Sequence, residues 1–137
     1  MRSMRGAALM EFAMAWPVAL VLVLGAVETA VWGSEAFAAR AAAVAGARAA
    51  AVEGATPAVA VAVTIRVLSP SLVGVTAAAW CPGESLHRPA VWVCGRDLGV
   101  AIEVDVGGQV PAIVPFVDQG GLPLHAHVVV QKEVFAK

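Results

Sequence analysis

Few side chains in this 137-residue chain could carry out chemistry, because it has no Tyr, two Cys and three His. His125 and His127 are two positions apart, so on a strand they would share one face, and such a pair could bind a metal. No third ligand is identifiable beside them, and the pair is also typical of an ordinary exposed strand. Phosphate-binding loops, nucleophile elbows and HExxH motifs are absent from the sequence. We therefore expect no metal, no cofactor, no small-molecule substrate and no enzymatic activity.

The two cysteines, Cys81 and Cys94, lie in the segment WCPGESLHRPAVWVC. With His87 they offer too few ligands, too widely spaced, for a zinc site. If the segment lies beyond a membrane in an oxidising compartment, two cysteines favour a disulfide. The bond would close a loop of about 14 residues and stabilise the fold by roughly 3 kcal/mol. We predict a Cys81–Cys94 disulfide.

The composition points away from a soluble enzyme, with 60% hydrophobic and only 14% charged residues. Soluble domains typically carry about 25% charged residues. The net charge of −1 also excludes the basic surface that nucleic-acid binding requires. The positions of the apolar residues are therefore more informative than the few polar ones.

Residues 12–27 carry no charge, and Glu11 and Glu28 stand at the two ends of this run. About 20 apolar residues cross a bilayer core. Arg2 and Arg5 precede the run, which predicts an N-terminus in the cytoplasm and a C-terminal domain outside. A cleaved secretory signal would have a shorter apolar core and no carboxylate before it, and a buried core helix would need more surrounding chain. We predict a single-pass transmembrane helix over residues 7–33.

Glu11 is the most informative position in this segment. A carboxylate at the bilayer centre costs about 2.5 to 3.5 kcal/mol on insertion scales, so it usually has a partner. In Arg5-Gly6-Ala7-Ala8-Leu9-Met10-Glu11-Phe12, a basic leader ends in Gly, and Glu is the fifth residue after it. This pattern resembles the class III signal of type IV pilins and pseudopilins, which prepilin peptidase cleaves after the Gly.

Over residues 5–54 the chain resembles, more narrowly, the TadE-like family of the tight-adherence (Flp) pilus system. The resemblance rests on the start at residues 6–12, on Pro17 inside the membrane helix, on Gly25 with Glu28 near its end, and on the Ala/Arg-rich run at 40–48. Met10 stands where the family often has Val or Ile. The fold implied is a pilin-like one, held in the cytoplasmic (inner) membrane.

The resemblance also implies roles for three residues. Gly6 would precede the cleaved bond, Ala7 would become the N-methylated N-terminal residue, and Glu11 would pair with the amine of a neighbouring subunit. Pairing a buried carboxylate with a buried ammonium offsets much of the desolvation of each. Alternatively, Glu11 only marks the inner interface. The implied partners are prepilin peptidase, other pilins or pseudopilins, and the pilus assembly machinery.

Beyond the membrane we expect the helix to continue as a stem over residues 34–54, since only Pro17 opposes a helix from Ala7 to Glu53. Gly54 is expected to cap it. Small residues repeat at every fourth position, which lets helices approach closely, although such matches also arise by chance in an Ala-rich chain. The two series are Gly25, Thr29, Gly33 and Ala42, Gly46, Ala50.

The stem should seat the outer domain on one face and expose its charges on another. We expect the seat to be formed by Phe37, Ala41, Val44 and Val52. Arg40, Arg48 and Glu53 are expected to be solvated.

Residues 55–137 are predicted to form an outer α+β domain. Thr56-Pro57 is typical of a helix start, whereas the alternation of β-branched residues after it favours a strand; we favour a helix over 57–68, as the family resemblance implies. Clearer strands are expected at 73–80, 90–94, 98–106 and 125–135, with an apolar, Pro-broken loop at 110–123. The predicted fold class is α+β: a long N-terminal transmembrane and stem helix followed by a small antiparallel β-sheet domain.

Two functions of different classes follow. The first is a TadE-like minor pilin or pseudopilin whose leader, residues 1–6, is removed by prepilin peptidase before it acts in tight-adherence pilus assembly. The second is a signal-anchored single-pass envelope protein whose outer domain binds a partner or ligand through the 110–123 loop. Glu11 separates them, because a plain anchor does not need this carboxylate.

Overall fold

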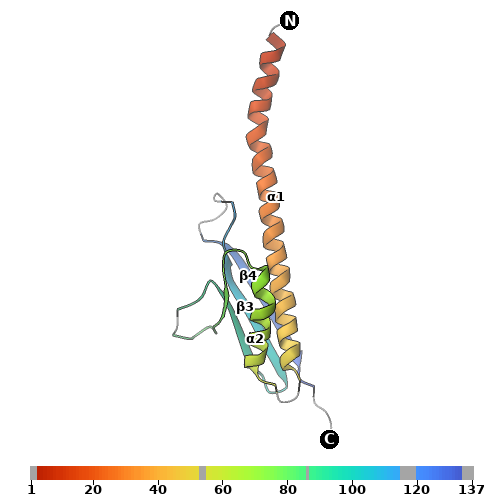
Figure 1. Cartoon of the computed structure of the whole chain (residues 1–137), viewed down its shortest axis with the longest axis vertical. Helices are drawn as coiled ribbons and strands as arrows, with labels where there is room; N and C mark the ends of the chain where they lie inside the picture. The colour runs from red at the N-terminus through yellow and green to blue at the C-terminus, as the bar shows by residue number, and fades with distance from the viewer. Residues whose placement is uncertain (1–2, 53–54, 86, 115–119, 134–137) are drawn as a thin grey trace.

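The protein consists of one long helix with a small α+β domain packed along its C-terminal half (Figure 1). The computed structural model describes residues 3–52, 55–85, 87–114 and 120–133, with side chains from residue 9 onward. In chain order the elements are α1 (Ser3–Ala50), α2 (Pro57–Leu68), a 3-10 turn η1 (Ser69–Ser71), β1 (Ala77–Ala79), β2 (Val91–Asp97), β3 (Ala101–Val110) and β4 (Leu122–Gln131). This confirms the predicted α+β class with a long N-terminal helix.

The long helix α1 runs without interruption through Pro17 and ends at Ala50, three residues before the predicted end at Glu53. Glu53 and the expected cap Gly54 lie outside the described residues. The helix has two unlike halves. From residue 9 to residue 27 every residue except the half-buried Gly25 is exposed, whereas the half that begins at Glu28 carries the buried positions.

Four strands form one sheet in the order β1-β2-β3-β4. The pairs β2–β3 and β3–β4 are antiparallel as expected, but β1 pairs with β2 in parallel, so the sheet is mixed. β1 and β2 are parallel because the chain between them returns to the end of the sheet at which β1 began. Parallel neighbours always need such a crossover connection.

The strand boundaries also differ from the prediction. Only Ala77–Ala79 of the expected strand at 73–80 is extended in the sheet. The predicted loop at 110–123 is shorter than expected, because β3 continues to Val110 and β4 already begins at Leu122. Residues 115–119 of that loop lie outside the described residues.

The second helix settles the choice left open for residues 57–68. Thr56 is extended at the N-cap and Pro57 occupies the first turn. The buried residues Ala60, Thr64 and Leu68 recur at every fourth position. This helical period wins over the alternation of β-branched residues because α2 packs on one face, where only every third or fourth residue meets a neighbour.

The predicted seat of the domain on the stem is wrong. Phe37 is 76% exposed and Val52 is 51% exposed, and Ala41 also faces solvent. Small side chains instead allow α2 and the sheet to approach the α1 backbone closely, so the alanines form the seat. The buried positions of this face are Ala39, Ala42, Ala43, Ala47 and Ala50. Arg40 and Arg48 are exposed, as predicted.

The sheet turns one face to the two helices and the other to solvent. On β3, Ile102, Val104 and Val106 are fully buried in the core, while Glu103 and Asp105 lie on the opposite face. This is the alternation expected of a half-buried strand.

Candidate functional site

The proposed processing motif lies at the free end of α1. Gly6 and Ala7 are helical, and the structure describes only their backbone. Glu11 follows about one turn later and is exposed, and among the described residues no group binds its carboxylate. An unpaired carboxylate on a bare apolar helix is therefore available to a partner from outside the chain.

The N-terminal half of α1 is long and apolar enough to cross a membrane, and its apolar window is entirely unburied by the rest of the chain. Phe12 and Trp16 stack along it with ring centroids 6.1 Å apart. Residues 6–28 span about 33 Å at 1.5 Å per residue, which matches a hydrocarbon core of about 30 Å. The described part of the chain thus contains one helix that fits a membrane span.

The two series of small residues on α1 have different surroundings. Gly25 and Gly33 have open space where a side chain would stand, and Thr29 is exposed, with its hydroxyl donating to the Gly25 carbonyl oxygen at 2.8 Å. A side chain at Gly46, in contrast, would overlap the Thr64 hydroxyl and the Ala60 carbonyl of α2. The series around Gly46 therefore packs against α2 of the same chain, whereas no described residue packs against Gly25 or Gly33.

Where the exposed N-terminal half of α1 ends, three side chains bind backbone groups of the outer domain. The carboxylate of Glu28, only 5% exposed, accepts the backbone N–H of Ile113 at 2.9 and 3.1 Å and that of Val114 at 2.9 Å. Trp32 Nε1 donates to the Pro123 carbonyl oxygen at 3.0 Å.

One turn further, Glu35 is 3% exposed and accepts the backbone N–H of Val73 at 3.0 Å. Residues 28, 32 and 35 are spaced so that they share one face of the helix. We call Glu28, Trp32 and Glu35 the junction residues. They satisfy backbone N–H groups of two loops and the C=O group of Pro123 near the start of β4, and so fix the end of the domain to α1.

The sequence assigned another role to one of these residues. Glu28 was expected at the end of the uncharged run and, with Gly25, as part of the motif that resembles the TadE-like family. The spacing 28, 32, 35 was a usable signal for a common helix face. The partners could not be found, because they are backbone groups 85 and 86 residues away from Glu28.

The predicted disulfide between Cys81 and Cys94 is present. It fastens the β1–β2 connection to the solvent-facing side of β2. Beside it, Trp80 meets Trp92 edge to face at 5.7 Å, and the guanidinium of Arg88 lies 5.9 Å from the Trp80 ring centroid. Trp92 covers Gly107 so closely that a Cβ there would overlap its ring. The disulfide and the two tryptophan rings therefore cover this half of the solvent-facing side of the sheet.

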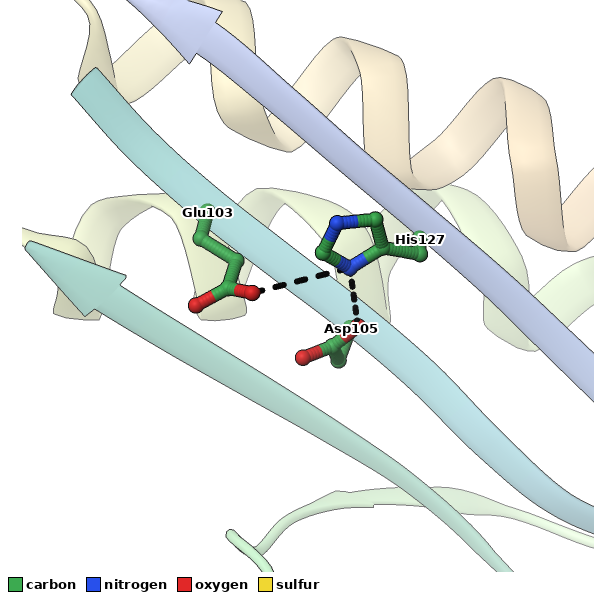
Figure 2. Close-up of side chains that lie close together, drawn as sticks. All are labelled: Glu103, Asp105 and His127. Carbon is green, nitrogen blue, oxygen red and sulfur yellow. Dashed lines mark hydrogen bonds and ion pairs between the residues drawn. The ribbon is translucent and has the colours of Figure 1, made fainter. Parts of the chain in front are cut away.

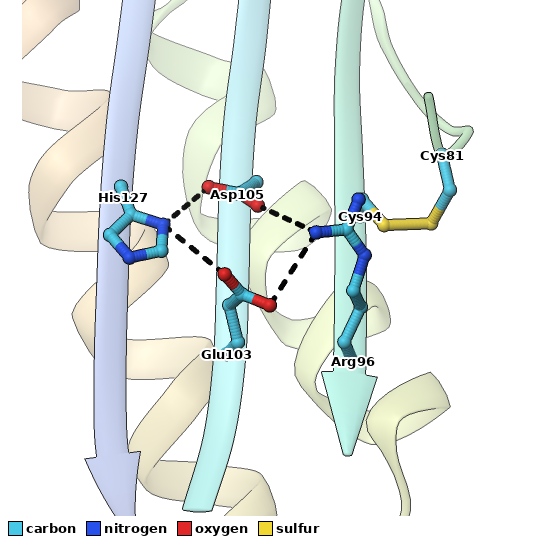
Figure 3. Close-up of polar contacts among 6 residues, drawn as sticks. All are labelled: Cys81, Cys94, Arg96, Glu103, Asp105 and His127. Carbon is cyan, nitrogen blue, oxygen red and sulfur yellow. Dashed lines mark hydrogen bonds and ion pairs between the residues drawn. A yellow bond between two sulfur atoms is a disulfide. The ribbon is translucent and has the colours of Figure 1, made fainter. Parts of the chain in front are cut away.

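The other half of that face carries charged side chains on three strands, which we call the cross-strand network: Arg96 on β2, Glu103 and Asp105 on β3, and His127 on β4. Figure 2 shows the last three of these residues. His127 Nδ1 donates to Asp105 Oδ1 at 2.6 Å and lies 3.6 Å from Glu103 Oε1. On the other side, Arg96 Nη1 lies 3.5 Å from Glu103 Oε2 and 3.6 Å from Asp105 Oδ2, as Figure 3 shows. Each carboxylate thus stands between a guanidinium and an imidazole.

This network contains the additional ligands that the sequence did not reveal for His127. One ligand atom each from Glu103, Asp105 and His127 lie within 4.8 Å of one another. The register aligns His127 with Asp105 directly and leaves His125 opposite Gly107, so the two histidines do not act together. Arg96 already neutralises one of the two carboxylate charges, and the geometry is that of an electrostatic clamp between strands.

A separate ion pair lies where β2 and β4 end, at the end of the sheet away from the N-terminal half of α1. Lys132 Nζ donates to both oxygens of Asp97 at 2.7 Å, and Asp97 Oδ1 accepts the Gly99 N–H at 2.8 Å. The hydrogen bond from Lys132, with that from Gly99, lowers the pKa of Asp97 below its ordinary value of 3.8. Gly99 has φ of +84°, which the turn between β2 and β3 requires.

Comparison of the chain with family models, with curated proteins and with solved structures gives no match.

Proposed function

We propose that this chain is a TadE-like minor pilin or pseudopilin, a membrane-anchored subunit that acts in tight-adherence (Flp) pilus assembly. In this proposal α1 crosses the cytoplasmic membrane with its N-terminus inside, and the outer domain stands on the far side. Prepilin peptidase cleaves between Gly6 and Ala7. Other pilins or pseudopilins and the assembly machinery then bind the mature subunit.

One observation carries the proposal: a single uninterrupted helix joins the Gly6-to-Glu11 motif to the outer domain, and its N-terminal half is bare. A subunit that packs against copies or partners needs such a free apolar helix. The open positions at Gly25 and Gly33 support the same role, because small residues allow close helix contact in a membrane.

Glu11 is the residue on which the pilin-like role depends. Its carboxylate is exposed on the bare helix and has no partner among the described residues. In a membrane such a group is costly unless it is paired. The new amine of Ala7 in a neighbouring subunit would supply the opposite charge, so that each group offsets the desolvation of the other.

The cleavage is tested by mass spectrometry of the mature N-terminus in cells with and without prepilin peptidase. We expect an N-methylated Ala7 only where the peptidase is present. A Gly6→Val variant should stay uncleaved, whereas Gly33→Val, at an open position on the same helix, should be cleaved normally. An N-terminus at Met1 in both strains, or one near residue 38, would refute the proposal.

The role of Glu11 is tested separately in cleaved protein. Glu11→Ala should reduce subunit cross-linking and pilus assembly while leaving membrane insertion intact. The control is Glu84→Ala, which removes an exposed carboxylate from the outer domain. Normal assembly by Glu11→Ala would instead favour the signal-anchored envelope protein.

A further inference from the structure

Two described loop segments at the end of the outer domain that faces the N-terminal half of α1, residues 72–76 and 111–114, are uncharged and mainly apolar. The chain has no charged residue in segments 67–76 and 106–114, which comprise these loop residues and the ends of α2 and β3 next to them. Ile113 is 52% exposed and Val73 is 51% exposed there. Figure 1 shows that the described residues next to β3 and β4 at this end lie towards the N-terminus of α1.

Glu28 fixes the position of this end of the domain along the axis of α1. Its carboxylate holds the backbone of Ile113 and Val114, so these residues lie beside the helix position at which the bare half ends. Because residues 6–28 match the thickness of a hydrocarbon core, Ile113 stands where α1 emerges from the bilayer.

We infer that this end of the domain docks on the membrane surface, with Ile113 inserted among the lipids of the leaflet from which α1 emerges. The occupant is the bilayer because the apolar surface of the loop continues that of the membrane helix, where Leu24 and Val27 are 37% and 49% exposed. This inference requires that α1 spans the membrane, and it does not depend on cleavage or on pilus assembly.

The test places one environment-sensitive fluorophore (NBD) on an introduced cysteine of the full chain in phosphatidylcholine/phosphatidylglycerol vesicles. The native cysteines form a disulfide, so only the introduced thiol reacts without reductant. The two variants are Ile113→Cys and Leu98→Cys. Both wild-type side chains are 52% exposed, but Leu98 lies in the β2–β3 turn at the opposite end of the sheet. If Ile113→Cys does not fold, Pro111→Cys replaces it, because Pro111 is also exposed.

We expect the label at 113 to emit at shorter wavelength than the label at 98. Lipids carrying a nitroxide near the headgroup should quench the label at 113 several times more strongly than the label at 98. A label at 113 that is blue-shifted but unquenched would show contact with protein and overturn the inference. Equal, weak quenching at both sites in vesicle-bound protein would also overturn it. Failure of the protein to float with vesicles would refute the membrane span itself, and the docking with it.

Discussion

The carboxylate of Glu28 accepts the backbone N–H of Val114 at 2.9 Å, which joins the last exposed turn of the apolar helix to a loop 86 residues later in the chain. This bond and those to Ile113 mark the boundary between the bare half of α1 and the half that carries the domain. A charged residue that the sequence places at the end of a membrane segment is therefore also a structural anchor for the outer domain.

Removing the Glu28 carboxylate should destabilise the domain. Glu28→Ala leaves the N–H groups of Ile113 and Val114 without their acceptor, at a cost of about 2 to 3 kcal/mol. Glu28→Gln keeps one carbonyl oxygen and should lose about half as much. Urea unfolding in detergent, followed by tryptophan fluorescence, measures both. Glu84→Ala is the control, and equal stability of Glu28→Ala and wild type would contradict the role.

The two glycines Gly46 and Gly33 should respond oppositely to the same substitution. Gly46→Ala forces a methyl group against Thr64 of α2, and overpacking of this kind costs about 1 to 3 kcal/mol. Gly33→Ala meets open space and should stabilise α1 by up to about 1 kcal/mol through helix propensity. Thermal unfolding of the monomer in detergent distinguishes them. A destabilised Gly33→Ala would show that this face is already occupied in the monomer.

Loss of the Cys81–Cys94 bond should lower stability by roughly 3 kcal/mol, since it closes a loop of about 14 residues. The double variant Cys81→Ser/Cys94→Ser and the reduced wild type should unfold at similar urea concentrations, both below the oxidised protein. Non-reducing electrophoresis reports the state of the bond. If reductant lowered the unfolding urea concentration of the double variant as much as that of the wild type, loss of the disulfide would not be the cause of the lower stability.

The pKa of Asp97 should rise towards its ordinary value of 3.8 when its partner Lys132 is replaced by Gln. The pKa is lower in the folded than in the unfolded state, so the stabilisation by this carboxylate is present above the unfolded pKa. It is lost as the pH falls through the folded pKa. The NMR chemical shift of the Asp97 carboxyl group, followed over the acidic pH range, measures this pKa. Lys132→Arg keeps a cation and should keep the low pKa, and an unchanged titration in Lys132→Gln would contradict the pair.

The cross-strand network should contribute little to stability, because the Arg96 side chain is 45% exposed and that of His127 is 48% exposed. Arg96→Gln is expected to cost no more than about 1 kcal/mol, since exposed ion pairs are weak. The effect should shrink in high salt, where exposed charges are screened. Chemical unfolding at low and high salt checks this, and a larger loss that salt does not reduce would contradict it.

Local chemistry made several features readable from the sequence. A run without charges predicts the bare helix, because apolar residues 12–27 admit few other structures. Thr56-Pro57 marks the start of α2, since the fixed φ of Pro suits the first helical turn. Two cysteines separated by 13 positions had only each other as partners. Each of these depends on neighbours in the chain.

The sequence by itself therefore determined the long helix, the α+β class and the disulfide, because periodicity, apolar length and turn residues act over short distances. Tertiary structure decided which face of α1 seats the domain, since close approach of α2 favours Ala over the larger Phe37. It also decided the register that brings Asp105 to His127 and the loop that Glu28 holds. These pairings join residues far apart in the chain, and only the packed sheet and helices bring them within hydrogen-bonding distance.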